Sequence, residues 1–229
     1  MRNIDWKAIE INWGGMNLEV PKEVKKEYED ESINCYPAPD NIFKAFNLCP
    51  LNKVKVVIIG QDPYPGAGKA NGLAFSTNEM TPDLIHMNEE LNANYVINSP
   101  DLTSWAKQGV LLMNSYLSVR EGEPLSHKNK RKKKYNWDKD VTIKVIKKLN
   151  HDDDNPKVFI LWGGHAIKFA EKLITNKQHK ILKSSHPSNQ GYKQELKAAG
   201  KQSFFGCNHF EKANEFLQKH GINPINWNT

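Results

Sequence analysis

The chain of 229 residues carries a formal net charge of +6 and has a sequence pI of about 9.0. Hydrophobic residues make up 38% and aromatic residues 10%, which is enough for a sizeable core. No apolar run approaches the roughly 20 residues of a membrane helix, and the N-terminus lacks the apolar segment of a secretory signal. We therefore expect no membrane partner and one intracellular domain over residues 1–229, cytoplasmic or, in a eukaryotic or viral setting, nuclear.

The three cysteines, Cys35, Cys49 and Cys207, form an odd set without a C-x-x-C pair. This pattern argues against a disulfide framework and against a zinc site. A reducing compartment is the expected environment.

The predicted elements alternate between helices and short strands. About 45 N-terminal residues look mainly helical and are expected to pack on the rest. Short apolar runs predict four strands, at Val54–Ile59, Val110–Met113, Val158–Trp162 and Ile181–Leu182, the last extended through 183–185. Helical spacing of apolar residues predicts helices at Thr142–Leu149, His165–Leu173 and Phe210–Leu217. This alternation predicts a single-domain α/β fold with a central four-stranded, mostly parallel sheet and helices on both faces.

Chemically useful residues follow all four predicted strands. The first strand runs into Gly60–Tyr64, the second into Asn114, the third into Gly163 and Gly164, and the fourth into His186. In a parallel sheet these ends lie at one edge, where ligands bind. We therefore expect a carboxylate, a carboxamide, a glycine pair and an imidazole to converge on one crevice.

The glycine-rich segment Gly60–Ala74 does not form a phosphate-binding loop. Pro63 stands where a P-loop requires its first glycine, and Ala70 replaces the Ser or Thr. The dinucleotide-binding spacing fails at Asn71, and the zinc-deaminase signature is missing from the sequence. These mismatches exclude NTP hydrolysis and zinc-dependent deamination.

Taken one at a time, the remaining candidates have ordinary structural explanations. Asp62 alone would be a turn residue, Asn114 a cap, Phe75 a core residue and His186 a buried structural histidine. Their combination at successive strand ends is what indicates a site.

Together these motifs resemble those of the family-one uracil-DNA glycosylases. Matching segments follow one another over about residues 50–217: GQDPYPG (Gly60–Gly66), GLAFS (Gly72–Ser76), WAKQGVLLMNSYLSVR (Trp105–Arg120), LWGGHA (Leu161–Ala166), HPS (His186–Ser188) and FFGCNHFEKAN (Phe204–Asn214). The pairing of GQDPY with the later HPS is highly specific, whereas the N-terminal segment adds little.

The resemblance implies a monofunctional DNA-repair glycosylase, free of metal and cofactor, that flips deoxyuridine out of DNA, releases uracil and leaves an abasic site. Asp62 would orient the attacking water and stabilise the positive sugar, and His186 would donate a hydrogen bond to uracil O2. Cleavage forms an oxocarbenium-like sugar and an anionic base, so both residue types stabilise charge as it develops.

The same resemblance implies how the base is read. Asn114 would hydrogen-bond N3–H and O4 of uracil and reject cytosine. Phe75 would stack on the flipped base, Tyr64 would exclude the methyl group of thymine, and Gln61 would contact the base through its backbone.

The sequence departs from the family in the loops that grip DNA. Pro65 replaces the usual His, Asp83 stands where a phosphate-binding Ser is usual, and the Gly-Ser loop has become Gly163-Gly164. Either Gln190 or Tyr192 takes the place of the family's wedging Leu. The expected DNA-binding positions are Pro82, Asp83, Gly163, Gly164, Ser188, Gln190, Tyr192, Lys130, Arg131 and Lys132.

The expected partner is uracil-containing DNA, single- or double-stranded, bound by a monomer that a proteinaceous inhibitor could block. Three other functions stay open: a DNA-binding accessory protein with weak catalysis, a glycosylase with an altered strand or lesion preference, or an unrelated nucleotide-binding α/β enzyme. Intact Asp62, Asn114 and His186 argue against the first, and intact Tyr64 argues against a changed base.

The Lys128–Lys134 run places six cations in seven residues and looks like an insertion after His127. A solvated loop, a nuclear-localisation tract and a phosphate-contacting loop all fit such a run. We hypothesise that its bulk charge stands in for the hydroxyl groups that would bind phosphate in the other loops of the family.

Replacing the six cations of this run with Ala should flatten the salt dependence of DNA affinity. The reason is that log K falls with log[salt] in proportion to the number of phosphates neutralised. Binding titrations at several salt concentrations check this, and an unchanged slope would contradict the hypothesis.

Overall fold

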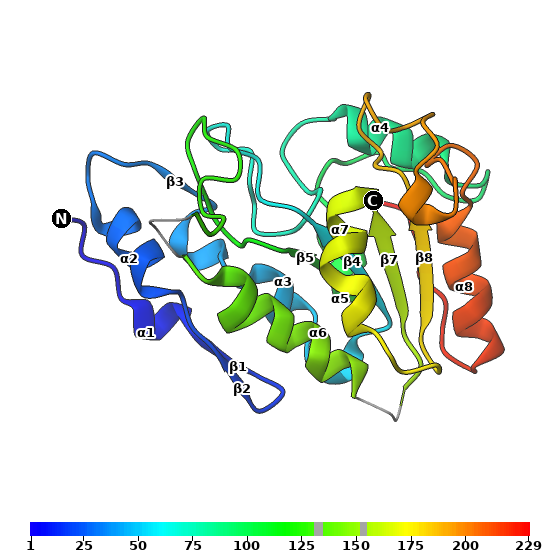
Figure 1. The fold of residues 1–229 in the computed structure, drawn as a ribbon, viewed down its shortest axis with the longest axis horizontal. Helices are drawn as coiled ribbons and strands as arrows, with labels where there is room; N and C mark the ends of the chain where they lie inside the picture. The colour runs from blue at the N-terminus through cyan, green and yellow to red at the C-terminus, as the bar shows by residue number, and fades with distance from the viewer. Residues whose placement is uncertain (131–134, 152–154) are drawn as a thin grey trace.

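The structure, a computed structural model, describes residues 1–130, 135–151 and 155–229. Its centre is a parallel sheet with the strand order β5-β4-β7-β8 (Figure 1). The four strands are β4 (Val56–Gly60), β5 (Val110–Asn114), β7 (Val158–Trp162) and β8 (Lys180–Ser184). The predicted α/β fold with a four-stranded parallel sheet is confirmed, and every predicted strand lies within two residues of an observed one.

Burial explains why these runs form strands. All residues of β4, β5 and β7 are buried, as expected for parallel strands covered on both faces. The edge strand β8 instead alternates between buried and more exposed positions. A continuous apolar run therefore marks the three strands that are buried on both faces, β4, β5 and β7. The weaker apolar pattern at 181–185 marks the edge strand β8.

Helices flank the sheet. Six of them are α3 (Lys44–Leu48), α4 (Pro82–Glu89), α5 (Thr103–Lys107), α6 (Ile143–Asn150), α7 (Gly163–Ala170) and α8 (His209–Lys219), and a π-helical turn at Trp137–Thr142 leads into α6. Helix α7 packs on β7 and β8, helices α3 and α5 pack on β5, and α8 packs on β7. Helices α6 and α7 lie nearer the viewer in Figure 1.

Helix α4 is not among the predicted helices and begins in a segment expected to be a DNA-gripping loop. Pro82 is its first residue, a position where the missing N–H of proline costs nothing. Thr81 precedes it as the N-cap, and its hydroxyl accepts the Leu84 N–H at 3.4 Å. The helix carries Asp83 in its first turn toward the carboxyl edge of the sheet.

The N-terminal segment contains a hairpin that the sequence analysis does not predict. Strands β1 (Ile11–Trp13) and β2 (Met16–Leu18) pair antiparallel between the helices α1 (Trp6–Ile9) and α2 (Lys22–Glu29). The two connecting residues, Gly14 and Gly15, both have positive φ, which a tight two-residue hairpin turn requires. The mainly helical segment expected there is thus a mixture of short helices and strands.

A second short ladder connects the N-terminal segment to the main fold. Strand β3 (Cys35–Tyr36) pairs antiparallel with β6 (Val119–Arg120), with Cys35 opposite Arg120. Because β6 follows β5 closely, this ladder places α2 and β3 next to the loop that leaves the central sheet. The N-terminal residues are therefore tied to the edge where the predicted site lies.

Aromatic residues fill the core behind the sheet. Trp105, Phe210 and Trp227 meet edge to face with ring centroids 5.0–5.7 Å apart, and the Trp105 indole donates to the Trp227 carbonyl at 3.0 Å. This contact fastens the C-terminal residues to α5 and α8. The three cysteines are buried, and none of them forms a disulfide bond. Among the described residues, no helix is long and apolar enough to cross a membrane.

Candidate active site

A pocket of about 230 Å³ opens at the carboxyl edge of the sheet. Its wall contains all six residues predicted to catalyse the reaction or to read the base: Gln61, Asp62, Tyr64, Phe75, Asn114 and His186. They come from the ends of β4 and β5, from the segment after β4 and from the loop after β8. The parallel topology therefore brings residues from widely separated segments together in one cavity.

The floor of the pocket depends on the pairing of Gly60 with Asn114. These residues are the last of β4 and β5 and lie opposite each other in the ladder. A Cβ at position 60 would lie only 2.1 Å from the Asn114 Oδ1, so only glycine leaves room for that amide. Ser115 strengthens the junction, because both its N–H and its hydroxyl donate to the Gly60 carbonyl at 3.0 and 3.1 Å. The Asn114 side chain is thereby held next to the Asp62 turn.

The Asp62 carboxylate is largely buried and is oriented by a backbone donor. The Leu125 N–H donates to Asp62 Oδ2 at 2.6 Å. Burial raises the pKa of Asp62, while the Leu125 N–H and the nearby His127 act to lower it. These two opposing influences decide how much of the carboxylate is ionised.

His186 is arranged as a neutral hydrogen-bond donor. Its Nδ1 accepts the Ser188 N–H at 3.1 Å, which assigns the ring proton of the neutral form to Nε2. Burial lowers the pKa of His186, and the Asp83 carboxylate partly opposes that effect. A neutral imidazole with Nε2–H is therefore the form that faces a ligand.

The aromatic side of the pocket is formed by Phe75 and Tyr64. Phe75 has φ +65°, an unusual conformation for a bulky residue, and its ring meets Trp162 edge to face at 5.5 Å. It also lies 5.7 Å from the His186 ring. The Tyr64 hydroxyl lies 3.4 Å from Thr81 Oγ1, and burial raises the pKa of Tyr64 to about 12. Both rings are thus fixed neutral walls.

A second hollow of about 330 Å³ adjoins this pocket. Gly163, Gly164 and Ser188 line it, and it shares Gln61 and His186 with the first pocket. A Cβ on Gly163, which has φ +85°, would lie 3.1 Å from the His186 Cβ. The glycine pair and Ser188 therefore lie beside the main pocket and not in its wall.

Asp83 and Pro82 reach the site through the first turn of α4. Asp83 lines the main pocket together with His186. Burial raises the pKa of Asp83, and the adjacent His186 and His86 rings act to lower it. Where the resemblance implies a phosphate-binding Ser, this chain thus has an acid on the wall of the pocket, which changes the charge as well as the shape.

The two candidates for the wedge residue differ in exposure. Tyr192 is only 6% exposed; its ring stacks on His86 at 3.8 Å and its hydroxyl donates to Glu89. Gln190 is exposed beside it. Lys130 is exposed as well, whereas Arg131 and Lys132 lie outside the described residues. The structure thus assigns Tyr192 to the packing of α4.

Several residues of the site were not identified from the sequence. Ile42, Leu117 and Pro124 also line the pocket, and Leu125 supplies the N–H to Asp62. Leu125 acts through its backbone, for which no residue type gives a signal. The apolar residues look like ordinary core or loop positions.

Comparison with known proteins agrees with this geometry. Residues 46–218 match the sequence model of the Uracil DNA glycosylase superfamily. Uracil-DNA glycosylase 1 of Listeria monocytogenes is 46% identical over 200 residues, 85% of this chain and 83% of that protein. The uracil-DNA glycosylase of Dictyostelium discoideum is 44% identical over 213 residues, 90% of this chain, but the match spans only 57% of that longer relative.

Solved structures give the same result. The crystal structure of mimivirus uracil-DNA glycosylase superposes with a TM-score of 0.78 at 28% identity, covering 91% of this chain and 80% of the other. A single-residue variant of mimivirus UNG in complex with UGI superposes equally well, with a TM-score of 0.78. The family match covers more than half of the chain and the sequence relatives exceed 40% identity over most of it. The chain therefore belongs to the uracil-DNA glycosylase superfamily.

Proposed function

We propose that Asp62 and His186 carry out the reaction of this family, hydrolysis of the N-glycosidic bond of deoxyuridine in DNA. The observation that carries the proposal is that a half-buried carboxylate, a neutral imidazole and the Asn114 amide line one pocket. A flipped base held between them has a negative group near its sugar and a donor near its oxygen. Such a site stabilises separated charge in the transition state.

Asp62 acts on the sugar. As the bond to the base breaks, positive charge develops on the sugar ring, and a nearby carboxylate in a poorly solvated pocket stabilises it strongly. The same carboxylate orients the water that adds to the sugar. The Leu125 N–H supports both roles, because it holds the ionised carboxylate in one orientation.

His186 acts on the base. Its Nε2–H donates to uracil O2 as negative charge develops on the departing base. A neutral donor suffices, because a hydrogen bond to an anion is stronger than one to the neutral ground state. The low pKa that burial gives His186 keeps the ring in this form at neutral pH.

Base selection follows from the fixed walls of the pocket. Asn114 pairs with N3–H and O4 of uracil, Phe75 stacks on the base, and Tyr64 crowds C5. Gln61 contacts the base through its backbone, whose carbonyl also accepts the Tyr116 N–H at 3.0 Å. An unpaired buried polar group costs about 1–3 kcal/mol, which is roughly a ten- to hundredfold preference per contact.

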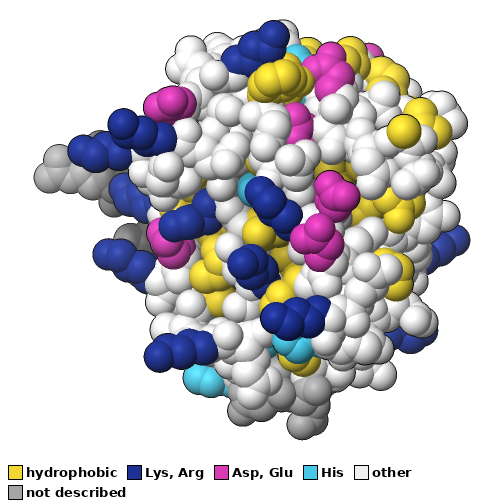
Figure 2. All heavy atoms as spheres, turned by 90° about the vertical axis from the view of Figure 1, so that its right-hand side faces the viewer, with side chains coloured by type: hydrophobic (Ala, Val, Ile, Leu, Met, Phe, Trp, Pro, Cys, Tyr) yellow, Lys and Arg dark blue, Asp and Glu magenta, His cyan; other side chains and the backbone are white. Residues whose placement is uncertain are grey.

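DNA binding is expected to draw on widely distributed positive charge. Figure 2 shows Lys and Arg side chains on the face that contains β8 and α8. Lys180, Lys183, Lys212 and Lys219 line a groove of about 570 Å³ there, with Glu215 among them. Positive potential of this kind speeds the encounter with DNA. If this face contributes to DNA binding, replacing Lys180, Lys212 and Lys219 with Ala should also flatten the salt dependence of DNA affinity.

We further propose an oligomeric state, a substrate and a compartment. We expect a monomer that acts on uracil-containing DNA, in the cytoplasm or nucleus, with no cofactor. The mimivirus relative was solved in complex with UGI, which supports a proteinaceous inhibitor for this chain as well. Gln190, exposed after His186, is the side chain available to enter the duplex when the base is flipped.

The purified protein with EDTA should release uracil from labelled oligonucleotides that carry a single uracil, alone or opposite A or G. Asp62→Asn should slow cleavage by about a hundredfold or more, because the charge opposite the sugar is lost. Alkaline cleavage of abasic sites provides the measurement. Folded, DNA-binding protein without cleavage would instead favour an accessory DNA-binding role.

Tyr64→Ala should allow release of thymine from a T·G pair, because the wall that crowds C5 is removed. Tyr64→Phe is the control, since it keeps the ring and loses only the hydroxyl near Thr81. Thymine release by both variants, or by neither, would contradict the steric role of the ring.

Gly60→Ala should reduce the single-turnover rate about 10- to 100-fold, because its Cβ would displace the Asn114 amide. The matched test is a double-mutant cycle with Asn114→Ala, in which the Gly60 change should have little further effect. Full additivity in the cycle would show that Gly60 acts elsewhere.

A further inference from the structure

The donor that orients Asp62 is placed by an unusual backbone conformation. Leu125 has φ +59°, a conformation that residues with side chains rarely adopt, and it aims its N–H at Asp62 Oδ2 at 2.6 Å. Pro63, the residue after Asp62, has no N–H to offer. The orientation of the carboxylate therefore depends on whatever holds Leu125 in place.

The loop around Leu125 is anchored at both ends. The Arg120 N–H donates to Ser126 Oγ at 2.7 Å, and the Lys128 N–H donates to the Leu125 carbonyl at 3.1 Å. The Gly122 N–H donates to the Pro65 carbonyl at 3.0 Å, which ties this loop to the turn that carries Asp62. These bonds fix the course of the backbone around Leu125.

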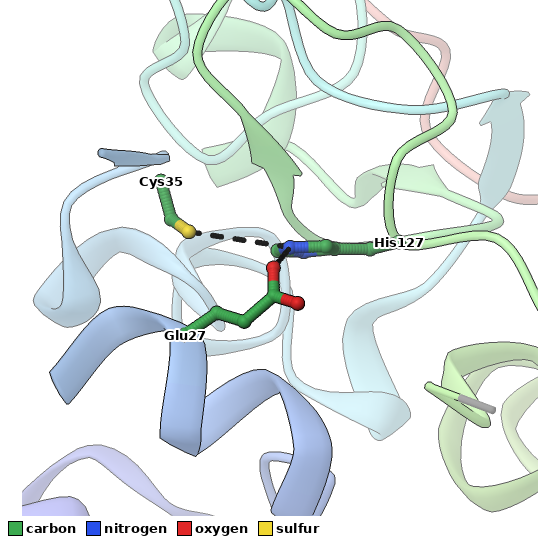
Figure 3. Close-up of side chains that lie close together, drawn as sticks. All are labelled: Glu27, Cys35 and His127. Carbon is green, nitrogen blue, oxygen red and sulfur yellow. Dashed lines mark hydrogen bonds and ion pairs between the residues drawn. The ribbon is translucent and has the colours of Figure 1, made fainter. Parts of the chain in front are cut away.

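A buried histidine, His127, anchors the loop to the interior of the protein. The His127 side chain is completely buried, and its Nε2 lies 2.9 Å from Glu27 Oε2 (Figure 3). Its Nδ1 lies 2.6 Å from Ser118 Oγ. Ser118 Oγ already accepts the Trp137 indole N–H at 2.7 Å. Its hydroxyl proton is thus available to His127 Nδ1, which leaves Nε2–H to donate to Glu27. His127 therefore links Ser118, in the segment after β5, to Glu27 of helix α2.

Glu27 is the anchor of this arrangement. It is 3% exposed, and its two oxygens accept Arg120 Nε and Nη2 at 2.7 and 2.8 Å, the Tyr135 hydroxyl at 2.7 Å and His127 Nε2. Four donors match the roughly four lone-pair sites of a carboxylate. A buried carboxylate that is paired and fully hydrogen-bonded resists displacement, so it gives the loop a rigid support.

Cys35 lies beside the same group, with Sγ 4.0 Å from His127 Nε2. Glu27, Cys35 and His127 place a potential ligand atom each within 4.8 Å of one another, as metal ligands do. Because both Glu27 oxygens already accept donors from a cation and a hydroxyl, we interpret the cluster as a hydrogen-bonded support.

We propose that Glu27 and His127 are positioning residues for the reaction: they hold Leu125 in its left-handed conformation and thereby fix the N–H that orients Asp62. The inference rests on the proposed role of Asp62. It gives the N-terminal helix α2 a part in the chemistry, although α2 contributes nothing to the wall of the pocket.

The electrostatics of Asp62 agree with this role. Burial raises the pKa of Asp62, and the main influence that opposes burial is the hydrogen bond from the Leu125 N–H, which belongs to the supported loop. If the support is lost, the pKa of Asp62 rises further, so a larger fraction of Asp62 is protonated and inactive at a given acidic pH.

Other groups near Asp62 are unchanged by that loss. Tyr116 faces Asp62, and burial raises the pKa of Tyr116 to about 12, which keeps it neutral over the working range. Asp83 and His186 lie on the wall of the same pocket and belong to α4 and to the loop after β8. The acid limb of a pH–rate profile is the range in which the rate falls as the pH is lowered. We therefore attribute to Asp62 any shift of this limb that a change at His127 or Glu27 causes.

The test is the pH profile of the single-turnover rate of uracil release for His127→Gln and Glu27→Gln. We expect the rate at neutral pH to fall about tenfold and the acid limb to move up by about half a pH unit or more. The Kd for substrate DNA should stay within about twofold. Tyr135→Phe, which removes one of the four bonds to Glu27, is a milder variant for the case that Glu27→Gln does not fold.

The matched control is His179→Gln. His179 is also a buried histidine, with Nδ1 accepting the Lys157 N–H at 3.2 Å and Nε2 3.1 Å from the Leu149 carbonyl, at the opposite end of the sheet. The His179→Gln variant should have a lower Tm than the wild type and an unchanged acid limb.

Folded His127 and Tyr135 variants with the wild-type acid limb would overturn the inference, even if their Tm falls. The Asp62→Asn variant distinguishes a failure of the proposed catalytic role of Asp62 from a failure of the proposed positioning role of Glu27 and His127. Full activity in that variant would refute the proposed function itself, whereas loss of activity there with unshifted His127 variants would refute only the positioning role.

Discussion

The site depends on one geometric constraint, the parallel register of β4 and β5. Gly60 lies opposite Asn114 at the end of that ladder, so the amide and the Asp62 turn must leave the sheet side by side. The contact is so close that a single Cβ would break it. Because β7 and β8 run in the same direction, the loops with Gly163 and His186 meet the same edge. The chemistry of the pocket therefore follows from strand direction and register.

That constraint also explains what the sequence could predict. Strands β4, β5 and β7 are continuous apolar runs, and such runs bounded by polar residues indicate buried parallel strands. Once the strands are located, their carboxyl ends identify Asp62, Asn114 and His186 without any knowledge of the side-chain contacts. The resemblance to a known family added the roles of Tyr64 and of Phe75, which taken alone would be a core residue.

The features that escaped prediction depend on contacts between distant residues or on the backbone. Tyr192 had the right place in the sequence for a wedge, but its stacking on His86 buries it. Helix α4 was not predicted, although proline is well tolerated at the first position of a helix. Leu125 contributes an N–H that every residue except proline has. Glu27 and His127 lie far apart in the sequence, and neither belongs to a recognisable motif.

The two proposed catalytic groups share one physical problem, which is that burial disfavours charge. For His186 this is an advantage, since a neutral ring is the required donor and burial lowers its pKa. For Asp62 it is a cost, because the carboxylate must stay ionised in the pocket that makes its charge effective. A donor aimed at Asp62 offsets that cost only if it cannot relax away, and Leu125 holds a conformation that would otherwise relax. The buried ion pair of Glu27 and Arg120 supplies the rigidity. The charged network around Glu27 therefore acts on the pocket through Leu125. Because burial removes water from around Asp62, the protein must hold the Leu125 N–H firmly as the hydrogen-bond donor that takes the place of water.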